Sequence, residues 1–133
     1  MKSSYKFNLN KKENNGILVP LEEDFNILFE IKRVFYTYKV PNNESRGNHA
    51  YFKTKQVLIC VSGSVEVRCF DGIKESVYKL DNPSQGIYID PKVWRTTYNH
   101  SDDCVVLIIS SNSYDESDYI RDYKKFLEEV KCI

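Results

Sequence analysis

One stretch near the middle of this 133-residue chain constrains the fold more than any other. It places His49 and Tyr51 two residues apart, just after the turn-forming Gly47. On a β-strand both of these side chains point to the same face. Gln56 follows five residues after Tyr51, and the apolar run 57–61 comes next. The spacing therefore predicts a strand that carries an imidazole and a phenol side by side.

Written as a pattern, G-x-H-x-Y-(four)-Q-(six)-G resembles the first cupin motif, in which His-x-His and a later Glu hold a metal inside a small β-barrel. The segment 86–99, which contains Arg95, resembles the second cupin motif. Only His49 remains of the four ligands, because Tyr51, Gln56 and Arg95 occupy the other positions. A guanidinium keeps its proton and offers no lone pair, so we expect no metal. A pocket for acid–base chemistry or plain binding is left.

The remainder of the chain indicates an all-β protein, because short apolar runs alternate with turn signals. Besides the motif strand, and after a polar segment at 1–16, we expect strands at 17–21, 25–40, 65–70, 75–80, 86–89, 94–99 and 105–111. From Ser117 the apolar residues follow helical spacing, with Ser117 as the cap and Lys131 at the negative end. The predicted fold is an all-β cupin jelly-roll barrel with a C-terminal amphipathic α-helix, as a single domain over 1–133.

The predicted strand 25–40 contains an arginine in an apolar row. Strict alternation puts Arg33 on one face with Phe29, Ile31 and Phe35. Two explanations fit this pattern: an arginine whose stem covers apolar surface at a strand end, or an anion contact at the mouth of the barrel. The alternation alone does not choose between them.

Charge and cysteine content exclude several classes of partner. The chain has 19 basic and 19 acidic residues without a basic block, which argues against nucleic acid. No cysteine pair has C-x-x-C spacing, so we expect buried free thiols at Cys60, Cys69, Cys104 and Cys132. Neither a signal-peptide core nor a membrane-spanning run is present, which predicts a cytoplasmic protein without a membrane partner. His100 lies in a polar turn and is expected to be solvated.

Five segments carry a more specific resemblance: 31–34, 46–50, 56–58, 90–94 and the tail 114–121. Together they resemble the sugar 3,4-ketoisomerases that act on dTDP-4-keto-6-deoxyglucose. The tail pattern is not a general cupin feature, which makes the resemblance specific. It implies a homodimeric cupin jelly roll that works without metal or cofactor.

The reaction that the resemblance implies moves a ketone from C-4 to C-3 of the sugar through an enediol. The product would then feed an aminotransferase that makes a 3-amino-3,6-dideoxy sugar for surface glycans. By position, His49 is the candidate base for the C-3 proton, since the pKa of an imidazole lies close to working pH. Tyr51 replaces the second histidine of the family's His-Ala-His motif. Its ordinary pKa near 10 suits a proton donor rather than a base, although the replacement also fits a slow or inactive isomerase.

The resemblance also suggests how the nucleotide sugar is bound. Arg46 is the candidate partner of the diphosphate, because its fork of donors suits phosphate oxygens. Arg33 and Lys53 would line the substrate pocket. Tyr36 would contact the nucleotide or the sugar.

Asn15 and Arg95 stand at positions that the family associates with the face of C-4 that receives the proton. Arg95 resembles the type with a gluco product, whereas Asn15 matches neither type.

Two other functions stay open. One is a nucleotide-sugar 3,5-epimerase, which shares an Arg-Gly-x-His element. The other is a cupin that binds a nucleotide sugar without converting it.

Overall fold

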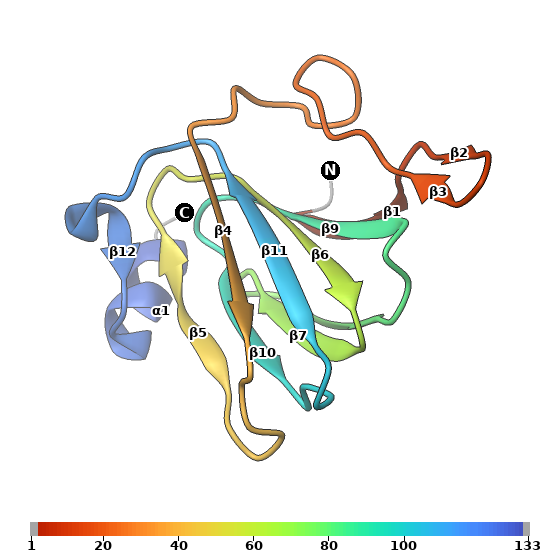
Figure 1. The fold of residues 1–133 in the computed structure, drawn as a ribbon. Helices are drawn as coiled ribbons and strands as arrows, with labels where there is room; N and C mark the ends of the chain where they lie inside the picture. The colour runs from red at the N-terminus through yellow and green to blue at the C-terminus, as the bar shows by residue number, and fades with distance from the viewer. Residues whose placement is uncertain (1–2, 132–133) are drawn as a thin grey trace.

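The computed structural model describes residues 3–131 and consists mainly of two five-stranded antiparallel sheets (Figure 1). The first sheet contains, in spatial order, β1 (Ser4–Asn8), β9 (Gln85–Ile89), β6 (Gln56–Ser62), β11 (Val105–Ser110) and β4 (Arg33–Tyr38). The second contains β12 (Tyr119–Ile120), β5 (Arg46–Tyr51), β10 (Trp94–Tyr98), β7 (Val65–Phe70) and β8 (Glu75–Leu80). A hairpin of β2 (Lys12–Glu13) and β3 (Ile17–Leu18) stands beside them. A 3₁₀ turn, η1 (Glu116–Asp118), and α1 (Tyr123–Lys131) complete the chain.

The facing sides of the two sheets enclose the larger apolar core. It consists of Leu58, Cys60, Val65, Val67, Cys69, Leu80, Ile87, Ile89, Val93, Cys104, Val106 and Ile108. Along β7 and β8 buried and more exposed residues alternate, as expected for strands with one face on a core. This arrangement confirms the predicted all-β cupin jelly-roll barrel with a C-terminal helix.

The prediction of one long strand over 25–40 is wrong, because regular structure begins only at Arg33. Phe29 and Ile31 pack in the second cluster with buried residues of β6 and β11. Phe35 packs against the inner core instead. Since the chain before Arg33 is irregular, alternation does not carry across it. Of Phe29, Ile31 and Phe35, only Phe35 therefore shares the face of Arg33, and the guanidinium lies 4.1 Å from the centre of that ring.

The C-terminal helix exists, but it begins at Tyr123 and Ser117 does not cap it. The preceding apolar residues form β12, whose register places Tyr119 opposite Tyr51 of β5. This pairing gives the backbone N–H and C=O groups of β12 hydrogen-bond partners, so these residues need not be helical. The spacing of apolar residues does not reveal such a long-range pairing. Lys131 lies in the last turn of α1, as expected.

Two further expectations have opposite outcomes. Three cysteines are buried free thiols, as predicted: Cys60, Cys69 and Cys104; Cys132 lies outside the described residues. The prediction of a solvated His100 is wrong, since this side chain is 1% exposed and its Nε2 lies 3.1 Å from the Thr97 hydroxyl. The polar sequence around His100 does not show that this side chain packs beside Thr97 of β10. Between residues 3 and 131, no helix has the length and apolar character needed to cross a membrane.

Candidate active site

A cavity of about 80 Å³ lies between the two sheets, where β4, β6 and β11 face β5 and β10. Its apolar wall continues the core and consists of Phe35, Leu58, Val106 and Ile108. Its polar wall consists of Thr37, Arg46, Gly47, His49, Tyr51, Gln56, Arg95 and Thr97. Four residues that sequence analysis assigned to the site, Arg46, His49, Tyr51 and Arg95, therefore meet in one cavity.

A β-bulge in β5 puts Arg46 on the cavity side. Side chains alternate along a regular strand, so Arg46 and His49, three residues apart, would face opposite ways. The register with β10 shifts here, which leaves Asn48 as the extra residue between His49 and Gly47. Arg46 then pairs with Thr97, and both side chains line the cavity.

Gly47 at this bulge has a φ of +87°, and a Cβ there would lie 2.9 Å from the carbonyl oxygen of Arg95. We expect Gly47→Ala to lower the free energy of unfolding by about 2–4 kcal/mol, because it adds a backbone clash to the strain of a positive φ. Gly16→Ala is the matched control, since Gly16 also has a positive φ but a Cβ there meets nothing within 4 Å. Urea denaturation measures both variants. Equal losses would contradict the close approach.

The residues at the three substituted cupin ligand positions bond to one another. Arg95 is 3% exposed, and its Nη1 donates a hydrogen bond of 2.8 Å to Oε1 of Gln56. Its Nη2 donates to the carbonyl of Val93 at 2.9 Å. Nε2 of Gln56 in turn donates to the hydroxyls of Tyr51, at 3.1 Å, and Ser110, at 2.9 Å. This network joins β6, β10 and β5 and fixes the orientation of the Tyr51 phenol.

The donor set of this network does not fit a divalent cation. The guanidinium of Arg95 has no lone pair to share, and the amide oxygen of Gln56 already accepts its hydrogen bond. Within residues 3–131, no group of three or more His, Cys, Asp or Glu side chains is placed to hold a metal ion. These residues therefore do not form a metal site.

His49 lies among aromatic rings and positive charges. Its ring centre is 4.9 Å from that of Tyr51 and 5.0 Å from that of Tyr119. Burial lowers the pKa of His49 to about 3, and the charges of Arg95 and Arg121 act in the same direction. Nδ1 is buried without a hydrogen-bond partner, so Nε2 is the nitrogen that can face a ligand. At neutral pH the ring is uncharged, which is the form that accepts a proton.

This lowered pKa predicts that the free energy of unfolding decreases as the pH falls from 6.5 towards 3. In that range the unfolded chain binds a proton at His49 and the folded chain does not, so acid favours unfolding. We expect wild type to lose at least ~1 kcal/mol more than His49→Asn between pH 7 and pH 4. Urea denaturation at a series of pH values measures this difference. The contributions of titratable groups that both proteins contain cancel in it. Parallel curves would contradict the lowered pKa.

Three other residues predicted for the site do not line the cavity. Tyr36 is 63% exposed and alternates with the cavity residues of β4. Lys53 is exposed in the loop after β5 and lines a separate surface hollow. Asn15 lies between β2 and β3, on the hairpin that stands away from β5 (Figure 1). Arg33 lies beside the cavity, and its Nη1 donates to the hydroxyl of Tyr119 at 3.2 Å.

Tyr119 is not among the residues predicted for the site, although its ring contacts those of His49 and Tyr51. The only available signal was the tail segment 114–121, which carried part of the family resemblance. Position along the chain gave no reason to place this segment beside β5. The pairing of β12 with β5 creates that proximity.

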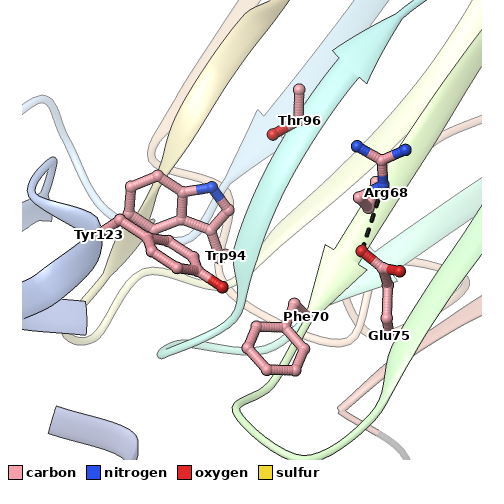
Figure 2. A pocket seen from close by; sticks show the side chains of 6 residues that line it. All are labelled: Arg68, Phe70, Glu75, Trp94, Thr96 and Tyr123. Carbon is pink, nitrogen blue, oxygen red and sulfur yellow. Dashed lines mark ion pairs between the residues drawn. The ribbon is translucent and has the colours of Figure 1, made fainter. Parts of the chain in front are cut away.

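A larger hollow, of about 410 Å³, lies on the outer face of the second sheet. Figure 2 shows its lining: Arg68, Phe70, Glu75, Trp94, Thr96 and Tyr123. Because side chains alternate along β10, Trp94 and Thr96 face this hollow whereas Arg95 and Thr97 face the cavity. No residue predicted for the site lines it, so the cavity around His49 is the candidate active site.

Comparison with known proteins shows the family of the chain. The family model described as FdtA: WxcM-like, C-terminal matches residues 3–131. A TDP-4-oxo-6-deoxy-alpha-D-glucose-3,4-oxoisomerase from Aneurinibacillus thermoaerophilus is 44% identical over 121 residues, which cover 91% of this chain and 87% of that protein.

Solved structures give the same result. A mutant of the 3,4-ketoisomerase QdtA from Thermoanaerobacterium thermosaccharolyticum, in complex with TDP-4-keto-6-deoxyglucose, superposes with a TM-score of 0.94 at 38% identity. The match covers 98% of this chain and 96% of that one. NovW, a 4-keto-6-deoxy sugar epimerase from Streptomyces spheroides, has a TM-score of 0.75 at 15% identity, over 89% of this chain and 68% of that one. This second likeness shows the fold alone.

Proposed function

The chain belongs to the FdtA, WxcM-like C-terminal family, and we propose that it converts dTDP-4-keto-6-deoxyglucose to the 3-keto-6-deoxy sugar. It is a sugar 3,4-ketoisomerase. We propose that residues 1–133 act as one domain. The observation that carries the mechanism is an uncharged His49 in a cavity between the sheets, with its Nδ1 buried.

In the proposed reaction Nε2 of His49 removes the C-3 proton, whose acidity comes from the neighbouring C-4 ketone. Negative charge then develops on the enediolate oxygen, and the buried guanidinium of Arg95 stabilises it. The same negative charge opposes the effect of Arg95 and Arg121, whose charges lower the pKa of His49. The pKa of the ring therefore rises as the reaction proceeds, and the ring holds its proton more firmly. Tyr51 delivers a proton to C-4 while the hydroxyl proton passes from O-3 to O-4, which leaves the ketone at C-3. Each general acid or base of this kind contributes ~10²–10⁴-fold.

The cavity holds the reacting part of the sugar, against His49 and Tyr51. The nucleotide then lies outside the mouth, where Arg46 is exposed and its fork of donors suits the diphosphate. Arg33 supplies a second positive charge beside Tyr119.

We also propose a homodimer in which the second copy covers β4. This strand is the edge of its sheet, and its outward side chains Val34, Tyr36 and Tyr38 are 55%, 63% and 60% exposed. An apolar row on an edge strand favours association with another chain. In such a dimer the predicted substrate-binding residues Asn15, Tyr36 and Lys53 would serve the partner's cavity. Light scattering tests this: Tyr36→Lys should give monomers where wild type gives dimers.

We propose the gluco product, 3-keto-6-deoxyglucose, on the resemblance at Arg95. An aminotransferase would then use it to make a 3-amino-3,6-dideoxy sugar for surface glycans. The buried free thiols suit the reducing cytoplasm, which is the compartment that we propose.

Incubation of the substrate in D₂O tests the function, with label followed at C-3, C-4 and C-5 by NMR. The proposal predicts exchange at C-3, label at C-4 of the product, and coupling constants of a gluco sugar. Label at C-5 would support a 3,5-epimerase instead. Binding without label would support a cupin that does not convert its ligand.

A further inference from the structure

The ring of Tyr119 lies against both side chains that we assign to proton transfer. Its centre is 4.7 Å from that of Tyr51 and 5.0 Å from that of His49. The register of β12 with β5 places Tyr119 directly opposite Tyr51, so the two phenols are cross-strand neighbours. With His49 and Tyr51 also 4.9 Å apart, the three rings form one cluster.

Two arginines surround the phenol of Tyr119. Nη1 of Arg33 donates a hydrogen bond of 3.2 Å to its oxygen, and the guanidinium of Arg121 lies 4.2 Å from the centre of its ring. An ion pair of 2.7 Å with Glu116 holds Arg121 in this position. A negative charge on the Tyr119 oxygen would therefore receive a charge-assisted hydrogen bond from Arg33.

The environment of Tyr51 is less favourable to negative charge. Tyr51 is 3% exposed. Burial raises the pKa of its phenol, and the neighbouring Tyr119 phenol raises it further, against the opposing charge of Arg95. A Tyr51 that gives its proton to the substrate would thus leave a poorly solvated phenolate inside the barrel. Proton delivery by Tyr51 is easier if another group replaces the proton at once.

We propose that Tyr119 is a positioning residue for this step: it holds the Tyr51 phenol and resupplies its proton. The inference rests on the proposed function. As the C-4–H bond forms, the O-3 hydroxyl proton passes to O-4 and the C-3 ketone forms. In the same step the O–H bond of Tyr51 breaks and Tyr51 takes the O–H proton of Tyr119. The negative charge ends on the Tyr119 oxygen, beside Arg33. The proton that His49 took from C-3 returns through solvent to Tyr119, which restores every group.

Tyr119→Phe tests the proposal, because it keeps the ring and removes only the hydroxyl. We expect kcat to fall about 10–100-fold with KM unchanged, while the deuterium exchange that His49 catalyses at C-3 continues at the wild-type rate. Tyr51→Phe should also slow turnover. Since both variants interrupt one route, the double variant should be no slower than Tyr51→Phe.

Tyr114→Phe is the matched control, because Tyr114 is another phenol of the same tail, with its ring centre 5.6 Å from that of Tyr119 and its hydroxyl bonded to Glu116. It should keep the wild-type kcat. A wild-type kcat in Tyr119→Phe, or an equal loss of C-3 exchange and product formation, would overturn the relay alone. Absence of isomerisation by the wild-type protein would instead overturn the proposed function, and the relay with it.

Discussion

His49→Asn should lower kcat for isomerisation by about 10³-fold, in the range expected for loss of a general base. Asparagine is close to histidine in size, but its amide does not accept the C-3 proton. The ring of His49 is uncharged at neutral pH, so the substitution removes no charge from the cavity. The Kd for thymidine diphosphate should therefore stay within about threefold of wild type. Product formation followed by NMR and calorimetric titration of the diphosphate measure the two quantities.

His100→Asn is the matched control for this prediction. His100 is the second histidine of the chain, it is buried, and burial also lowers its pKa, but it does not line the cavity. This variant should keep the wild-type kcat even if it unfolds more easily. The account is contradicted if His49→Asn retains a kcat within about fivefold of wild type, or if its main defect is a weaker Kd.

Arg95→Met should lower kcat about 10²–10³-fold, as expected for loss of a group that stabilises developing negative charge. Methionine fills much of the space of the buried side chain but brings no charge and no donor for Gln56. Because the charge of Arg95 helps to lower the pKa of His49, this variant should also raise that pKa above about 3. NMR titration of the His49 ring protons measures the shift, and steady-state kinetics measure kcat.

Arg68→Met is the control for Arg95→Met, because Arg68 lies on the outer face of the same sheet and pairs with Glu75 at the surface (Figure 2). It should change neither kcat nor the titration of His49. An unchanged His49 titration in Arg95→Met would show that the guanidinium does not act on the imidazole. In that case its proposed role at the enediolate would have to be abandoned.

The strand predictions succeed where a turn fixes the alternation and fail where the chain leaves a sheet. The hairpin of 65–70 and 75–80 agrees with β7 and β8, because the turn at Asp71-Gly72 sets its register. The predicted strand 25–40 fails in its first half because those residues pack on the outside of the barrel. The predicted helix start at Ser117 fails because a neighbouring sheet edge takes up Tyr119 and Ile120. Both failures come from long-range packing that local spacing does not contain.

The predictions for the site also divide into those that local spacing supports and those that depend on long-range packing. His49 and Tyr51 could be placed together from their spacing, and Arg46 only by resemblance, since alternation alone puts it on the other face. The bulge at Asn48 brings Arg46 back to the cavity. Tyr119 is 68 residues beyond Tyr51 in the sequence and meets it only through β12.

The central claim is that Nε2 of His49 removes the C-3 proton of a 4-keto sugar. Loss of the C-3 proton signal of dTDP-4-keto-6-deoxyglucose in D₂O, followed by NMR with wild type and with His49→Asn at equal enzyme concentration, tests it most directly. The account predicts rapid loss of the signal with wild type and a rate about 10³-fold lower with His49→Asn. Equal rates with the two proteins would contradict it.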